Sequence, residues 1–140
     1  MISYIFMILF VLYFIHLMKP VKDLKYISMD SFSMLLKDKP VNSKILDIRD
    51  QVDYHAFHIE RAINISLGRL PYVKKAEFNK EDEIFLISDS KYQSKKAARI
   101  LKRSGFENLT HVNGGMAGYT RFMNGQGQSK RLQVRREKWC

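Results

Sequence analysis

The feature that most constrains the fold is an uncharged apolar run at the start of the sequence. Residues 1–18, MISYIFMILFVLYFIHLM, contain no charged side chain, and the clearly polar residues Ser3 and His16 lie near its ends. As a helix these 18 residues rise ~27 Å, close to the ~30 Å hydrocarbon core of a bilayer. The run therefore predicts one N-terminal transmembrane helix over residues 1–18.

Two other structures for this run are a buried core helix and a cleaved signal peptide. A buried helix of this kind would be apolar on all sides, which does not suit a small domain. A signal peptide has a basic segment before its apolar part and a small-residue cleavage site after it. Here no Lys or Arg precedes the run, and it ends in Leu17-Met18-Lys19-Pro20. The membrane anchor is therefore favoured.

The orientation of the anchor follows from the positive charges beside it. Lys19, Lys22 and Lys25 come directly after the apolar run, and no basic residue comes before it. Since positive loops stay inside, the sequence predicts a single-pass protein of the cell membrane with its domain facing the cytoplasm. The single cysteine, Cys140, agrees with this location because one cysteine cannot form an internal disulfide.

The net charge of +10 raises the question of nucleic-acid binding. No helix-turn-helix, RNA-binding or zinc-finger motif accompanies the charge, so no nucleic-acid partner is expected. Residues 124–140 form a basic C-terminal tail, which suits either anionic lipid headgroups or a solvated extension. Its cationic side chains are Lys130, Arg131, Arg135, Arg136 and Lys138.

The chain length leaves room for about one domain, between a basic linker at residues 19–25 and the tail. Within residues 26–123, short apolar runs alternate with amphipathic segments. Strands are predicted at 26–28, 43–48, 62–65, 82–87 and 109–112. Helices are predicted at 30–37 with Asp30 as the cap, at 51–57, 67–75 and 94–103, and as a short helix from Gly114. This alternation predicts an α/β domain with a mostly parallel sheet covered on both faces.

Two long segments resemble known motifs at matching separation. Residues 46–65, LDIRDQVDYHAFHIERAINI, are similar to the first motif of rhodanese-like domains, D-[VI]-R…EY…HI-x-G-A-x-N, with Arg61 in place of the glycine. The segments EIFLISDS and SKKAARILKRSGFENLTHVNGGMAGY resemble the second half of the same domains. The resemblance covers about residues 26–122 and implies a three-layer domain with a five-stranded parallel sheet and helices on both sides.

The same resemblance bears on chemistry. Rhodanese-like sulfurtransferases follow the buried strand with a loop C-x-x-G-x-R, whose cysteine carries a persulfide, and the N-terminus of the next helix stabilises the anionic sulfur. In this chain the resemblance aligns Ser88 with the cysteine, Lys91 with the glycine and Gln93 with the arginine. A serine hydroxyl is a weak nucleophile without a base and forms no stable persulfide. No confident catalytic residue is therefore predicted.

The candidate binding site is this loop with the helix N-terminus behind it. Its residues are Ser88, Asp89, Ser90, Lys91, Tyr92, Gln93 and Ser94. With Lys95 and Lys96 nearby, the loop suits either a contact with a small anion or an acidic protein partner, or a solvated helix face. The leading interpretation is a catalytically inactive rhodanese-like binding or scaffold module at the cytoplasmic membrane face. The alternative is a sulfurtransferase-related enzyme that uses Cys140 or a partner's thiol as the sulfur carrier.

Three residues of the first motif are expected to support the structure around the loop. The resemblance implies an ion pair between Asp47 and Arg49 at the end of a strand and a hydrogen-bonding role for His58. His111 is expected to be a partly exposed sheet residue. One cysteine and scattered histidines offer no metal-ligand spacing, and no phosphate-binding glycine motif is present, so no metal or cofactor is predicted.

Overall fold

A computed structural model describes residues 1–73 and 76–137, and their side chains as far as residue 127. Its centre is a five-stranded sheet in the order β1-β5-β4-β2-β3, with every neighbouring pair parallel. The strands are β1 (Lys25–Ile27), β2 (Ser43–Asp47), β3 (Ile63–Asn64), β4 (Glu83–Ile87) and β5 (Leu109–Val112). The predicted five-stranded parallel sheet is confirmed.

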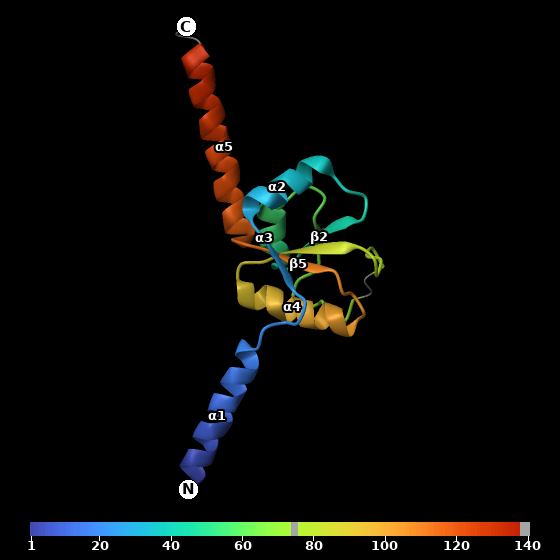
Figure 1. Cartoon of the computed structure of the whole chain (residues 1–140), viewed down its shortest axis with the longest axis vertical. Coiled ribbons are helices and arrows are strands. Elements are labelled where there is room, and N and C mark those ends of the chain that lie inside the picture. The colour runs from blue at the N-terminus through green and yellow to red at the C-terminus, as the bar shows by residue number, and fades with distance from the viewer. Residues whose placement is uncertain (74–75, 138–140) are drawn as a thin grey trace.

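Helices cover both faces of the sheet, as Figure 1 shows. The helices α2 (Met29–Asp38), α3 (Gln51–Ala56) and α5 (Gly115–Glu137) lie on one side, and α4 (Lys91–Arg103) lies on the other. The central strand β4 shows why two layers are needed. Ile84 and Leu86 pack into the core beneath α4, whereas Phe85 and Ile87 pack into the core beneath α2 and α5. A strand buried on both faces is typical of a parallel sheet.

The helices differ from the predicted ones at their ends. The N-cap of α2 is Ser28, whose hydroxyl accepts from the Ser31 N–H at 3.2 Å, so the predicted cap at Asp30 is wrong. Helix α4 begins at Lys91, three residues earlier than predicted, because Ser90 caps it. Residues 67–73 form turns rather than the predicted helix. The last helix extends to Glu137 and is not short.

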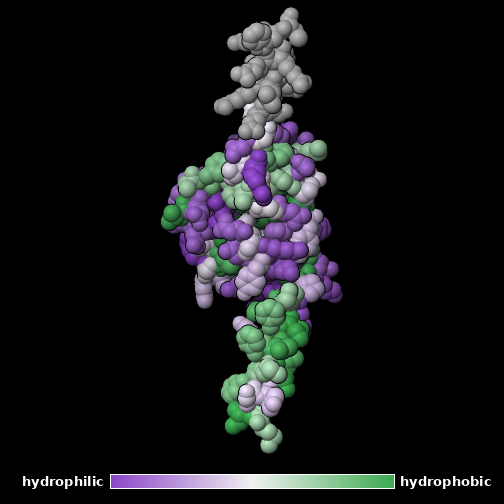
Figure 2. All heavy atoms as spheres, turned by 90° about the vertical axis from the view of Figure 1, so that its left-hand side faces the viewer, coloured by the Kyte–Doolittle hydropathy of each residue, from purple (hydrophilic) through white to green (hydrophobic). Residues whose placement is uncertain are grey.

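The apolar N-terminal run forms helix α1 (Ile2–Met18), which projects from the core without any buried residue. Figure 2 shows it as an almost continuous hydrophobic rod below a largely polar domain. In the described part of the chain, no helix combines the length and the apolar character needed to cross a membrane. The transmembrane helix predicted over residues 1–18 is therefore not found.

The basic tail is described only in part. Helix α5 runs through residues 124–137 without a break, whereas residues 138–140 lie outside the described residues. The predicted lipid contacts of Lys130, Arg131, Arg135, Arg136 and Lys138 and the predicted role of Cys140 fall on side chains that the structure does not describe. These contacts, and the domain boundaries, stay predictions.

Candidate active-site loop

The candidate loop connects the carboxyl end of β4 to the N-terminus of α4. Ser90 caps the helix, since its hydroxyl accepts from the Gln93 N–H at 3.3 Å. Gln93 makes the reciprocal bond with its side chain, whose Oε1 accepts from the Asp89 N–H at 3.1 Å. This reciprocal pair is close to a capping box. It fixes the loop with Asp89, Ser90, Lys91 and Tyr92 on the surface and Ser88 below them.

Ser88 is 1% exposed, and its hydroxyl lies inside a chain of hydrogen bonds. Ser88 Oγ donates to the Ser90 carbonyl oxygen at 2.8 Å and lies 2.7 Å from Ser94 Oγ. Ser94 Oγ in turn lies 2.8 Å from His111 Nδ1 on the neighbouring strand β5. Ser94 and His111 are also buried. The candidate site therefore rests on a buried Ser88–Ser94–His111 network.

Counting protons fixes the direction of this network. A serine hydroxyl has one proton, and Ser88 gives its proton to the Ser90 carbonyl. Ser94 must then donate to Ser88, which leaves His111 Nδ1 to donate to Ser94. The imidazole thus serves as a donor at Nδ1 and takes no proton from either serine. Ser88 has no general base in this arrangement and is held as a structural hydroxyl rather than an activated nucleophile.

His111 lies in a setting that favours its neutral form. Burial lowers its pKa below the usual 6.5, and the positive charge of Lys91 lowers this pKa further. Lys91 Nζ lies 4.6 Å from the centre of the Tyr26 ring, and the same ring meets His111 edge-on at 5.7 Å between centroids. The prediction that His111 is partly exposed is wrong: it is 4% exposed.

Beside the loop, the end of β2 is braced by a buried ion pair. The Arg49 Nη2 atom lies 2.7 Å from Asp47 Oδ2, and Arg49 also donates through its own N–H and through Nε to Asp47 Oδ1. Asn64 then donates to the carbonyl oxygens of both residues at 3.0 Å. Because Asp47 is in register with Ile87, this brace stands next to the residue that precedes Ser88. A buried carboxylate of this kind needs such partners.

The other predicted support residue and its neighbour lie away from the loop. His58 is exposed, and its Nδ1 lies 2.8 Å from the Tyr54 carbonyl oxygen while its ring stacks on Tyr54 at 4.0 Å. His55 is exposed and lies 3.3 Å from Gln51 through its Nε2. Within the part of the chain that the structure describes, neither histidine hydrogen-bonds to Ser88, and His111 is the histidine of the loop network.

Helix α5 touches the loop backbone from the other face. A Cβ atom on Gly115, whose φ is +53°, would lie 2.0 Å from the Ser88 carbonyl oxygen. Only glycine allows an approach this close. Gly115 thus lets α5 begin directly against the Ser88 backbone.

The outer surface of the loop suits an anion. The first-turn N–H groups of α4 at Lys91 and Tyr92 have no intrahelical acceptor, and the helix N-terminus carries a partial positive charge. Lys91 and Lys96 are exposed, Lys95 is half-buried, and all three add positive charge in the first two turns. Asp89 is the one acidic residue of the loop. The arrangement can hold a small anion at the surface while Ser88 stays beneath it.

The sequence also matches a known family. The model of the Rhodanese-like domain family matches residues 28–122, more than half of the chain. The chain belongs to the rhodanese-like domain family.

Two named relatives of this rhodanese-like domain are larger proteins. The chain is 36% identical over 95 residues to the putative sulfur carrier protein YrkF of Bacillus subtilis, covering 67% of this chain and 50% of YrkF. It is 28% identical over 113 residues to the tRNA uridine(34) hydroxylase of Photorhabdus laumondii, covering 77% of this chain and 32% of the hydroxylase. The chain thus spans half or less of the length of these relatives.

Solved structures share the fold at low identity. The single-domain sulfurtransferase RDL2 of Saccharomyces cerevisiae superposes with a TM-score of 0.64 at 16% identity, covering 74% of this chain and 94% of that chain. The Alr3790 protein of Anabaena superposes with a TM-score of 0.64 at 23% identity, covering 69% of this chain and 77% of that chain. At these identities the likeness establishes the rhodanese-like fold alone.

Proposed function

We propose that this rhodanese-like domain acts in sulfur transfer by binding an anionic sulfur donor at its loop, while a thiol of another molecule accepts and carries the sulfur. The family and the similarity to a sulfur carrier protein support a sulfur-related role. A catalytically inactive membrane scaffold has no comparable support. The observation that carries the proposal is the Ser88 hydroxyl, which is buried and donates to the Ser90 carbonyl.

The proposed reaction needs no sulfur on the domain itself. With thiosulfate as the donor, an external thiolate attacks the outer sulfur atom and forms a new sulfur–sulfur bond. The bond between that sulfur and the sulfite group breaks, and sulfite leaves with the electron pair, so that a persulfide anion remains on the external thiol. The domain's part is to hold the dianion with the first-turn N–H groups and Lys91 and so reduce its repulsion of the incoming thiolate.

Thiosulfate and glutathione are suitable probes for the test. Titration of the full-length chain with thiosulfate should shift the amide NMR signals of residues 90–93, and Lys91→Glu should weaken the shifts. The wild-type chain should speed the formation of glutathione persulfide from thiosulfate. After thiosulfate alone, mass spectrometry should find no added sulfur atom on the chain.

Two results would contradict the proposal. If thiosulfate caused no shift in the amide signals of residues 90–93, the loop would not be an anion-binding site. An added sulfur atom on the chain that disappears in Cys140→Ser would instead assign the carrier role to the tail cysteine, the alternative already considered.

The cellular setting of this activity also remains a proposal. We place the domain at the cytoplasmic face of a membrane, with its basic tail near anionic lipid and an unnamed protein supplying the thiol. The hydroxylase relatives act on tRNA by name, but the chain covers only 32% of the hydroxylase of Photorhabdus laumondii. We therefore keep the expectation that this chain has no nucleic-acid partner.

A further inference from the structure

A cavity lies at the other end of the sheet from the Ser88 loop. It has a volume of about 210 Å³ and opens between the end of α2, the first residues of β2 and the segment that leads into β3. Its inner wall is apolar and comes from Phe32, Leu36, Ile45, Ile59 and Phe85. Since β3 has only two residues, the sheet edge here is short.

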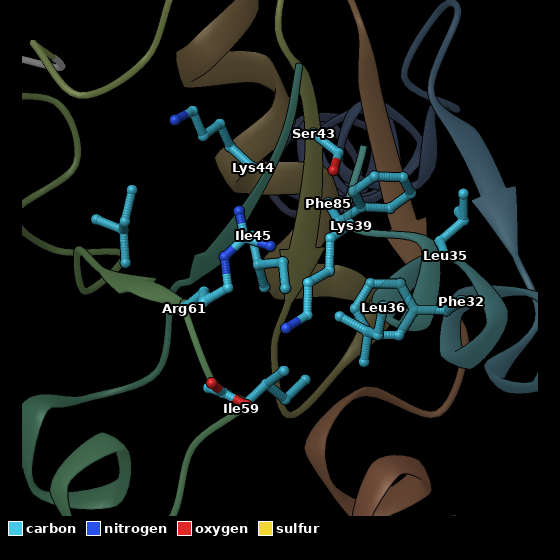
Figure 3. A pocket seen from close by; sticks show the side chains of 12 residues that line it. Phe32, Leu35, Leu36, Lys39, Ser43, Lys44, Ile45, Ile59, Arg61 and Phe85 are labelled. Carbon is cyan, nitrogen blue, oxygen red and sulfur yellow. The ribbon is translucent and has the colours of Figure 1, made fainter. Parts of the chain in front are cut away.

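The mouth of this cavity is positively charged. Lys39, Lys44 and Arg61 line it, opposed by one carboxylate, Glu60. Figure 3 shows the amine of Lys39 and the guanidinium of Arg61 pointing into the same opening in front of Ile45, while the amine of Lys44 turns away. Among the described residues, neither Lys39 nor Arg61 forms an ion pair or a side-chain hydrogen bond. Two free cations therefore face an apolar wall.

The backbone at both cations is unusual. Lys39 has φ +47° and Arg61 has φ +67°, the left-handed region that residues other than glycine rarely adopt. Lys39 ends α2 in this conformation, where glycine is the usual residue. Backbone strain held at a cavity mouth is typical of ligand sites.

We propose that this cavity binds a small organic carboxylate whose apolar body is about the size of one aromatic ring. A cavity of about 150 Å³ lined by apolar side chains holds benzene, so the volume here suits a ring with a short chain. The ring would lie against Ile45, Ile59 and Phe85, and the carboxylate would lie at the mouth. Arg61 offers the forked donor geometry that carboxylates prefer, and Lys39 adds a second charge.

The test uses phenylpropionate with the full-length chain and follows the methyl NMR signals of Leu36, Ile45 and Ile59. These methyl groups line the cavity and none belongs to α1. Binding of phenylpropionate to the apolar helix α1 would therefore leave these signals unchanged. Saturable shifts are expected, and the uncharged phenylpropanamide should bind at least about tenfold more weakly.

The chain offers a variant that removes the charges without breaking the fold. Lys39→Gly with Arg61→Gly deletes both cations at positions whose backbone suits glycine, and should weaken phenylpropionate binding about tenfold or more. The matched control, Lys37→Ala with Arg103→Ala, removes one exposed Lys and one exposed Arg outside the cavity and should bind as the wild type does.

Three results would overturn the proposal. The first is the absence of saturable shifts at the cavity methyl groups, and the second is equal binding of the amide and the carboxylate. The third is equal loss of binding in the control pair, which would mean that overall charge is responsible. Thiosulfate binding at the Ser88 loop is measured at different signals, so either proposal can fail without the other.

Discussion

At the scale of single residues, His111 decides how the candidate site behaves. Its Nδ1–H donates to Ser94 Oγ, and Ser94 donates to Ser88 Oγ. Ser88 in turn donates to the carbonyl oxygen of Ser90 in the loop. The sequence motifs pointed to the loop but not to His111, because nothing local marks a histidine as buried. In the structure His111 lies in the run Leu109-Thr110-His111-Val112, which is buried throughout.

The buried imidazole predicts a loss of stability in acid. The pKa of His111 is lowered in the folded chain, so the unfolded chain binds this proton more tightly. The stability that depends on neutral His111 is therefore fully present above the ordinary histidine pKa of 6.5 and is lost as pH falls toward the folded-state pKa. For one proton the loss is at most about 1.4 kcal/mol per pH unit.

Urea unfolding at about pH 7.5 and about pH 5.5 measures this loss. His111→Asn keeps a side-chain N–H donor for Ser94 but has no proton to gain, so its free energy of unfolding should change less between the two pH values. An equal change in wild type and variant would show that other groups cause the acid sensitivity.

A second residue-scale prediction concerns Gly115. Gly115→Ala places a Cβ atom 2.0 Å from the Ser88 carbonyl oxygen and forces alanine into a φ of +53°. Loop and helix α5 must then separate, and we expect the free energy of unfolding to fall by at least about 2 kcal/mol. Gly68→Ala is the matched control, because its Cβ would meet nothing within 4 Å. A similar fall in the control would contradict the close contact.

At the scale of elements, the loop and α4 form one unit. Gln93 and Ser90 together hold the start of the helix, so restoring a thiol alone does not restore the family's loop pattern. Ser88→Cys should therefore show little transfer of sulfur from thiosulfate to cyanide. Adding Lys91→Gly and Gln93→Arg should give more activity, since the loop then has the glycine and arginine of the motif.

The assay compares steady-state thiocyanate formation for the single and triple variants in a Cys140→Ser background. That background removes the one natural thiol. Turnover by the single variant that equals the triple variant would mean that the present loop already holds the anion in the family's geometry. Ser88 would then be the only loop residue that prevents sulfur transfer.

Sequence patterns predicted which strands and helices are present better than where each begins and ends. The strands β2 and β4 were found because their buried runs are short and continuous, and the same patterns fixed the parallel sheet. The cap at Ser28 was missed because Asp30 is also a common capping residue two positions later. The length of α5 was missed because Gly125 and Gly127 disfavour a helix locally. The Ser88–Ser94–His111 network joins three elements, so no local pattern contains it.

At the scale of the whole molecule, helix α1 stands apart from the folded core. None of its side chains is buried, and neither core cluster includes one of its residues. An exposed apolar surface of this kind marks a site of association. Among the described residues, the two core clusters are thus complete without α1, and no side chain of α1 is buried.

Removing residues 1–18 should therefore leave the domain as stable as before. We expect the free energy of unfolding of residues 19–140 to lie within about 0.5 kcal/mol of the full-length value, and the amide NMR spectrum of the core to be unchanged. Sedimentation should show less self-association, because the exposed apolar helix is gone. Unfolding of the shortened chain would mean that α1 has partners in the core.

A slightly longer deletion is the control, because the next residues do belong to the core. Leu24 is 7% exposed and lies in the cluster beneath α4. Arg99 donates to the Lys19 carbonyl oxygen at 2.7 Å, and Lys102 donates to that of Lys22. A chain of residues 25–140 loses these contacts with α4 together with one buried leucine, so its free energy of unfolding should fall by about 2–5 kcal/mol. Equal stability of the two shortened chains would place the boundary of the folded core after residue 24 and not at the end of α1.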